Sequence, residues 1–209
     1  MRKTGQRIDA QTNRRRLVDT VGRLLARQGT LTLTQLATES GVSRSTTYRN
    51  FATPTAAIEA FIDEFLTEFE TAVATKLATS SDPLQQLTDL CTRWGMLVEE
   101  RSHALIHVRS TEGFLARVRR RDPIIGRIHR IVSNTIEDAI DQGGLPALDV
   151  DYAVFLWNLL LDPRELLDLA EHRNQSITQA THELTTDYLN MLQHFTGTRT
   201  QWPPLRLRR

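Results

Sequence analysis

Residues 32–51 read TLTQLATESGVSRSTTYRNF, and this stretch decides the fold of the chain. Its first half predicts a helix over residues 33–39, because Thr32 is a good N-cap and Gln35, three residues further on, completes a capping box. Apolar side chains at i, i+3 and i+4 give this short helix one face that can pack against a core.

A tight break follows the first helix. Gly41 can adopt a positive φ angle without steric cost and so end the helix. Val42 can then fill the angle between two helices, and Ser43 can cap a second helix over residues 44–50. Two helices joined at a steep angle by a short glycine-containing turn form a helix-turn-helix.

The second helix consists mainly of short polar and cationic side chains, which suit a nucleic-acid groove better than a core. Arginine bonds guanine edges or phosphates, and hydroxyls and asparagine bond bases or phosphates. The alternative is a short polar surface helix beside a turn. The residues concerned are Arg44, Ser45, Thr46, Thr47, Arg49 and Asn50, with Tyr48 among them.

The charge distribution favours the nucleic-acid interpretation. Residues 1–50 contain ten basic and three acidic residues, a net charge of +7, whereas the rest of the chain contains 16 basic and 22 acidic residues, a net charge of −6. Such asymmetry separates an anion-binding part from a part that does not bind anions. Because the helix-turn-helix lies in the basic part, nucleic acid is the natural anion.

Cysteine content and hydropathy narrow the class of protein and its cellular compartment. Cys91 is the single cysteine, so the chain can form no internal disulfide and no cysteine-based metal motif, which suits a reducing cytoplasm. The basic N-terminus lacks the apolar run of a signal peptide, and no apolar run approaches the ~18 residues of a membrane span. We therefore expect a soluble, cytoplasmic protein that does not bind a membrane.

A basic helix is predicted from residue 12 or 13 to just before Gly29. Apolar residues at i, i+4, i+7 and i+8 form one stripe that is expected to pack on the next two helices and make a three-helix unit. The stripe is Leu17, Val21, Leu24 and Leu25, and its expected partners are Leu36, Val42, Tyr48 and Phe51. Residues 1–11 show no periodicity and predict a disordered start, which is compatible with an arm that orders on DNA.

The rest of the chain predicts only helices. Thr53 and Pro54 begin a helix of about 25 residues, or about 38 Å, which is too long for the three-helix unit to cover and must enter a second body. Cap and breaker signals, including the pairs Asp122-Pro123 and Asp162-Pro163, then delimit helices over residues 84–101, 102–121, 123–142, 150–161 and 176–195. A segment over residues 164–171 is kinked or broken from the helix before it, and the tail after residue 196 is expected to be mobile. The prediction is an all-α protein of about nine helices with domains over residues 1–52 and 53–209.

The basic first helix, the motif in residues 32–51 and the long fourth helix together resemble the TetR family of bacterial transcriptional regulators. The residues that carry the resemblance are Thr32, Leu36, Ala37, Gly41, Val42, Ser43, Thr46, Tyr48 and Phe51. The resemblance implies a homodimer whose last two helices pair with those of the partner, and middle helices that enclose an effector pocket. It also implies that ligand shifts the fourth helix and moves the DNA-reading heads apart. One departure is Pro54, which stands where many members have a lysine that contacts phosphate.

Residues of the helix-turn-helix are predicted to bind double-stranded operator DNA. Groove contacts are expected from Thr34, Arg44, Ser45, Thr46 and Arg49, and phosphate contacts from Thr32 and Tyr48, with Ser43 at the helix start. For Tyr48 the alternative is packing with the hydroxyl at the surface.

Large apolar side chains with a few polar ones suit a pocket for a small organic effector, although aromatic residues at helical spacing also build plain core. The candidates are Phe65, Phe69, Trp94, His103, His107, Phe114, Trp157 and Asn158. His103 and His107 share a helical face but lack a clear third ligand, so we predict no metal and no cofactor. The apolar runs predict a dimer interface, or alternatively internal core, with Leu156, Leu160, Leu184, Tyr188, Leu192 and Phe195.

These features predict a transcriptional regulator, most simply a repressor that a small molecule releases from a palindromic operator. An enzyme is the second class considered, but the chain has no G-x-S-x-G, P-loop, H-E-x-x-H or G-x-G-x-x-G motif, so we predict that it is not one. The third class is an architectural protein that uses the helix-turn-helix without sequence specificity.

Overall fold

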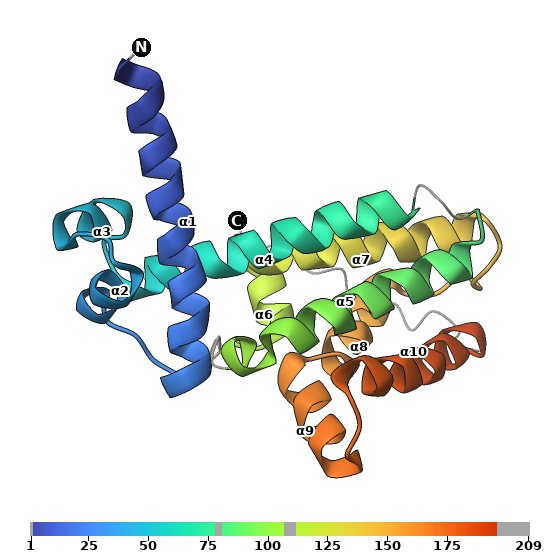
Figure 1. Ribbon diagram of the computed structural model, residues 1–209. Helices are drawn as coiled ribbons and strands as arrows, with labels where there is room; N and C mark the ends of the chain where they lie inside the picture. The colour runs from blue at the N-terminus through green and yellow to red at the C-terminus, as the bar shows by residue number, and fades with distance from the viewer. Residues whose placement is uncertain (1, 78–80, 107–111, 196–209) are drawn as a thin grey trace. The chain divides into compact units, whose positions relative to one another are not determined.

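The computed structural model describes residues 2–77, 81–106 and 112–195, except for the side chains of residues 2–8, 76 and 77. It confirms the all-α fold: the described part contains ten helices and no strand. The N-terminal helices are α1 (Arg2–Gln28), α2 (Leu33–Ser40), α3 (Arg44–Asn50) and α4 (Pro54–Leu77). The others are α5 (Pro83–Leu105), α6 (Phe114–Arg119), α7 (Pro123–Asp141), α8 (Val150–Leu160), α9 (Pro163–Arg173) and α10 (Ile177–Gln193) (Figure 1).

The chain divides into two compact units. The first contains α1–α3, α4 as far as Phe65, and the end of α5 from Arg101. The second contains α4 from Leu66, most of α5, and α6–α10. The division therefore falls within α4, whereas the sequence places a domain boundary at residue 52.

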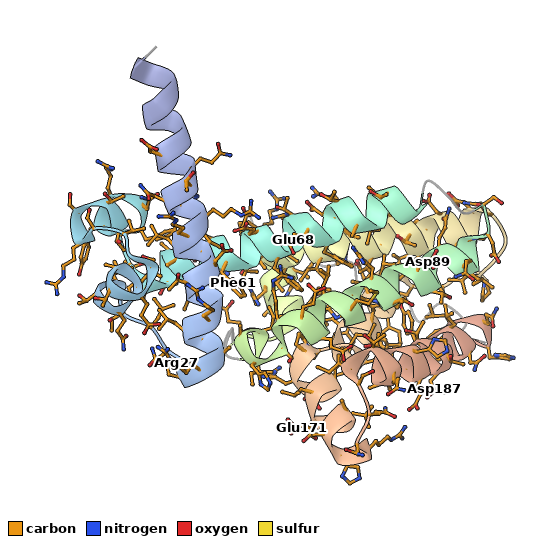
Figure 2. The ribbon with its side chains drawn as sticks, in the orientation of Figure 1. Arg27, Phe61, Glu68, Asp89, Glu171 and Asp187 are labelled. Atoms are coloured by element: carbon orange, nitrogen blue, oxygen red, sulfur yellow. The ribbon has the colours of Figure 1, made fainter. Side chains whose placement is uncertain are left out.

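The first unit has the predicted core. Leu17, Val21, Leu24 and Leu25 of α1 are fully or almost fully buried, as are Leu36, Val42 and Phe51. Phe61 of α4 (Figure 2) packs so closely on α1 that a Cβ atom added to Gly22 would lie 2.8 Å from its ring. Glycine therefore permits the close approach of these two helices.

Tyr48 does not join this core, contrary to the expected packing. Its side chain is 52% exposed, whereas Thr47 is completely buried. The hydroxyl of Thr47 donates to the carbonyl of Ser43 at 3.1 Å, so this polar side chain is buried without an unsatisfied donor.

The expected disordered start is wrong for residues 2–11, which lie in α1. No proline interrupts the chain between residues 2 and 28. Once residues 12–28 have nucleated a helix, each further residue adds one hydrogen bond, so an apolar stripe is not required for continuation. The tail after residue 196 lies outside the described residues.

The predicted helix over residues 102–121 is also wrong. Ser102 does not begin a helix but lies buried inside α5, and the N–H of Ile106 donates to its carbonyl at 3.1 Å. Serine is a cap only where the preceding backbone turns away, and nothing at residue 101 forces such a turn. The six-residue α6, which begins after Gly113, takes the place of the predicted helix among the described residues.

Side-chain caps begin α7, α8, α9 and α10, and those at Asp122 and Asp162 confirm the predicted ones. Asp122, Asp149 and Asp162 each accept hydrogen bonds from backbone N–H groups at the starts of α7, α8 and α9. Ser176 forms a capping box with Gln179 at the start of α10. These caps fix where each helix begins and therefore which face each buries.

Candidate nucleic-acid interface and effector region

The helix-turn-helix has the local geometry that its sequence predicts. Thr32 and Gln35 form a reciprocal capping box, with bonds of 2.9 Å from Thr32 N to Gln35 Oε1 and 3.2 Å from Gln35 N to Thr32 Oγ1. Gly41 has a φ angle of +68° and ends α2. Ser43 then caps α3 by accepting from the N–H of Thr46 at 3.2 Å.

The outer face of α3 carries four of the eight predicted DNA-binding residues. Arg44, Ser45, Tyr48 and Arg49 are exposed, and Thr46 is half-buried. Two guanidinium groups, a hydroxyl and a phenol therefore lie on one short helix, where they can reach base edges and phosphates.

The other candidates take supporting positions. Thr32 and Thr34 are exposed on α2 and its cap. Ser43 is exposed, and its hydroxyl donates to Thr46 Oγ1 at 2.9 Å. Asn50 differs from expectation, because its amide donates to the carbonyl of Thr46 at 2.8 Å and is thereby turned back onto α3.

Three arginines of α1 contact other side chains of the first unit. The guanidinium of Arg14 lies over the Phe51 ring, 5.2 Å from its centroid. Arg23 donates to Thr20 Oγ1 at 2.7 Å, and Arg27 forms an ion pair with Glu39 of α2. The basic charge of α1 therefore also has a structural role.

The predicted aromatic effector residues of the second unit form a packed cluster. Trp94 lies 5.2 Å, centroid to centroid, from both Phe69 and Trp157. Trp94 Nε1 donates to the Leu161 carbonyl at 2.8 Å, and Trp157 Nε1 lies 3.3 Å from Cys91 Sγ. All three rings are at least 95% buried and both indoles are hydrogen-bonded, so this cluster is core.

The remaining effector candidates are not brought to this cluster. Phe65 is buried in the first unit, where Arg101 lies 5.9 Å from its ring centroid. His103 is exposed, Phe114 and Asn158 are half-buried, and His107 lies outside the described residues. No three His, Cys, Asp or Glu side chains converge on a metal-sized site in the described part of the chain.

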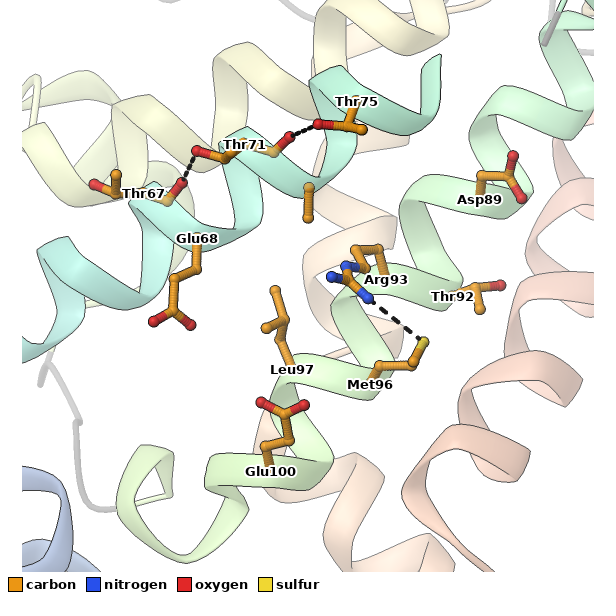
Figure 3. A pocket seen from close by; sticks show the side chains of 11 residues that line it. Thr67, Glu68, Thr71, Thr75, Asp89, Thr92, Arg93, Met96, Leu97 and Glu100 are labelled. Carbon is orange, nitrogen blue, oxygen red and sulfur yellow. Dashed lines mark hydrogen bonds between the residues drawn. The ribbon is translucent and has the colours of Figure 1, made fainter. Parts of the chain in front are cut away.

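A groove of about 880 Å³ lies between α4 and α5 of the second unit (Figure 3). Most of its lining residues are polar or charged positions of two amphipathic helices, so their pattern in the sequence is the same as that of a solvated helix face. The apolar and hydroxyl-bearing members of its lining are Thr67, Thr71, Ala72, Thr75, Thr92, Met96 and Leu97. The charged members are Glu68, Asp89, Arg93 and Glu100.

The predicted dimer residues divide into two groups. Tyr188 and Leu192 are buried within the chain itself, and the Tyr188 hydroxyl donates to the carbonyl of Ala153 at 2.9 Å. Half-buried positions are Leu156, Leu160, Leu184 and Phe195. Two further apolar side chains of α8 and α10, Leu159 at 53% and Met191 at 37%, are exposed and could contact a partner.

Comparison with protein families finds one match. Residues 21–53, which contain the end of α1, α2 and α3, match the model of the IclR helix-turn-helix domain. This family differs from the one that the sequence resembles, and the match covers only the helix-turn-helix. A comparison with curated proteins finds no match.

Solved structures match over most of the chain. The regulator FadR from Bacillus subtilis, in complex with stearoyl-CoA, is 14% identical with a TM-score of 0.71 over 86% of this chain and 97% of its own. A putative TetR-family regulator from Syntrophomonas wolfei is 11% identical with a TM-score of 0.71 over 87% and 95%. AibR, in complex with isovaleryl coenzyme A and operator DNA, is 15% identical with a TM-score of 0.61 over 87% and 98%.

None of the helices in the described ranges is long and apolar enough to cross a membrane. The helix order, the capped helix-turn-helix and the matches over more than four-fifths of the chain agree with one another. The chain therefore has the fold of the TetR family of transcriptional regulators.

Proposed function

We propose that the protein is a DNA-binding transcriptional regulator, and specifically a repressor that a small-molecule effector releases from a palindromic operator. The observation that carries the proposal is the outer face of α3, where Arg44, Ser45, Tyr48 and Arg49 are exposed on a helix whose start is fixed by the Ser43 cap. A fixed start gives these side chains a defined register against base edges.

The relatives support both halves of the proposal. AibR is described with operator DNA and isovaleryl coenzyme A together, and FadR from Bacillus subtilis with stearoyl-CoA. By analogy, this chain binds DNA through the first unit and an effector through the second.

We further propose that the protein acts as a homodimer through α8 and α10. Leu159 and Met191 are exposed on these two helices, and Leu156 and Leu184 are half-buried. A two-fold dimer places two recognition helices about 34–36 Å apart, or a multiple of that distance, so its operator is an inverted repeat. Charged substitution of Leu159 is expected to give monomers in sedimentation velocity.

The test is a footprint of the purified protein across the DNA upstream of its own coding sequence. A discrete protected inverted repeat supports the regulator. Uniform protection that varies only with salt supports an architectural protein instead, because phosphate contacts alone carry no sequence information. Absence of protection at any protein concentration would overturn the proposal.

A further inference from the structure

The α4 wall of the groove offers few hydrogen-bond donors to a ligand. Thr71 Oγ1 donates to the Thr67 carbonyl and Thr75 Oγ1 donates to the Thr71 carbonyl, both at 2.8 Å (Figure 3). Thr67 Oγ1 accepts from Arg127 Nη2 at 3.0 Å. The hydroxyl protons of Thr71 and Thr75 are therefore directed along α4, and a ligand that needs donors, such as a phosphate or a carboxylate, finds few on this wall.

The described lining has a net negative charge. Glu68, Asp89 and Glu100 carry three negative charges and Arg93 carries one positive charge, so the net charge is −2 whatever contacts these groups make with one another. A concave surface whose lining carries a net charge of one sign concentrates the opposite charge. The groove therefore attracts cations and repels anions.

Apolar groups lie between the charges. Leu97 is 6% exposed, and Met96, at 41% exposed, presents a flexible and polarisable thioether. In Figure 3 Leu97 and Glu68 extend toward the space between α4 and α5. The volume of about 880 Å³ falls in the range of about 300–1,000 Å³ that is typical of small-molecule sites.

We propose that this groove binds an amphipathic organic cation, that is, a cationic centre carried on a sizeable apolar body. The carboxylates match the charge, and Ala72, Met96 and Leu97 contact the apolar body. A coenzyme A thioester, which carries several phosphate charges, is disfavoured at this groove. Binding of the cation in the groove does not depend on the proposed function of the protein. Only the effect of the bound cation on DNA binding rests on that function.

Two probes of nearly identical shape and opposite charge test the proposal. Tetraphenylphosphonium and tetraphenylborate are titrated calorimetrically into the full-length protein. We expect the phosphonium to bind at one site per chain and to lose affinity at high salt. No phosphonium binding, or binding that no charge change in the groove alters, would overturn the proposal. The borate can also bind the arginines of the first unit, so variants are needed to locate each site.

Charge variants of opposite sign locate the site. Glu68→Gln and Glu100→Gln are each expected to weaken phosphonium binding about threefold, and Arg93→Gln to strengthen it about threefold. Glu171→Gln, the same charge change at an exposed position of α9 (Figure 2), is expected to leave the affinity unchanged. A gain of affinity in Arg93→Gln cannot arise from a folding defect, so this variant keeps the test decisive. An unchanged or weakened affinity in it contradicts the charge argument.

A second measurement separates this inference from the proposed function. The phosphonium is added to the protein bound at its footprinted site. Release of DNA supports both proposals. Binding without release supports the cation site and contradicts effector-controlled release through this groove. Absence of phosphonium binding by a protein that gives a discrete footprint overturns the cation site and leaves the DNA-binding regulator standing.

Discussion

Arg127 of α7 holds Glu70 of α4 through two hydrogen bonds, 3.0 Å from Nε to Oε1 and 2.6 Å from Nη2 to Oε2. The same Nη2 reaches Thr67 Oγ1, which lies in the wall of the groove, and Arg130 adds a bond of 3.3 Å to Glu70. In Figure 1 the second half of α4 runs beside α7. This ion pair therefore fixes one wall of the groove against the rest of the second unit.

The first prediction concerns the pH dependence of this ion pair. The hydrogen bond from Arg127, opposed by partial burial, holds the pKa of Glu70 below its ordinary value of 4.5. A carboxyl whose pKa is lower in the folded state stabilises the fold above its unfolded pKa, and this contribution disappears as the pH falls through the folded pKa. Glu70→Gln should therefore lower the free energy of unfolding by about 1 kcal/mol near neutral pH.

Urea denaturation of the wild type and Glu70→Gln measures this difference. The free energies of unfolding of the two proteins should become equal as the pH is lowered below 4.5. The exposed Glu171→Gln serves as the control and should show little difference at neutral pH. A Glu70→Gln difference that stays constant into acid would show that packing, rather than the ion pair, accounts for it.

The second prediction concerns the contact between α5 and α10. A Cβ atom on Gly95 would lie 2.5 Å from Thr181 Oγ1 and 2.7 Å from Thr181 Cβ. Gly95→Ala should destabilise the protein by about 1–3 kcal/mol, because both helices must separate. Gly126→Ala is the matched control: its added Cβ would meet nothing within 4 Å, so it should stabilise α7 by up to about 1 kcal/mol. Thermal unfolding ranks the wild type and the two variants by stability. An equal loss of stability in both variants would contradict the packing argument.

The third prediction concerns DNA recognition by α3. Arg44→Ala should weaken operator binding by about 1–3 kcal/mol, because a bidentate contact to guanine is lost, while the protein remains folded. Gel-shift titration measures the affinity, and circular dichroism checks the fold. Arg173→Ala, on α9, removes the same charge outside the helix-turn-helix and should have a much smaller effect. Unchanged affinity in Arg44→Ala removes this residue from the interface.

The fourth prediction concerns the basic start of the chain. Deletion of residues 1–7 removes Arg2, Lys3 and Arg7. Each phosphate contact contributes about 0.9 to the slope of log affinity against log salt concentration, so the slope should flatten by up to about 3. Gel-shift titrations over a range of salt concentrations measure it. An unaltered slope would exclude these residues from DNA contact.

The fifth prediction concerns Cys91. Burial raises the pKa of its thiol to about 11, against a weaker opposing hydrogen bond with Trp157. At pH 8 only about one thiol in a thousand is ionised, and none is accessible. Iodoacetamide should therefore label the native protein far more slowly than the protein unfolded in urea. Equal rates, measured by mass spectrometry, would show that this part of the second unit opens readily.

Local signals in the sequence determined much of this protein. Thr32, Gly41 and Ser43 placed α2 and α3 correctly, and the Asp–Pro pairs placed α7 and α9. Caps and breakers are readable because their hydrogen bonds and φ angles involve residues only two to four positions apart. The charge asymmetry between the two parts of the chain can likewise be calculated from the amino-acid composition of each part alone.

Tertiary structure decided what local signals leave open. Thr47 rather than Tyr48 faces inward on α3, and Ser102 continues α5 instead of beginning a helix. The groove between α4 and α5 joins residues 14 to 33 positions apart, and the Glu70–Arg127 pair joins residues 57 positions apart. Helical periodicity shows which residues share a face, but it does not show which other helix that face meets, because that depends on packing between distant segments.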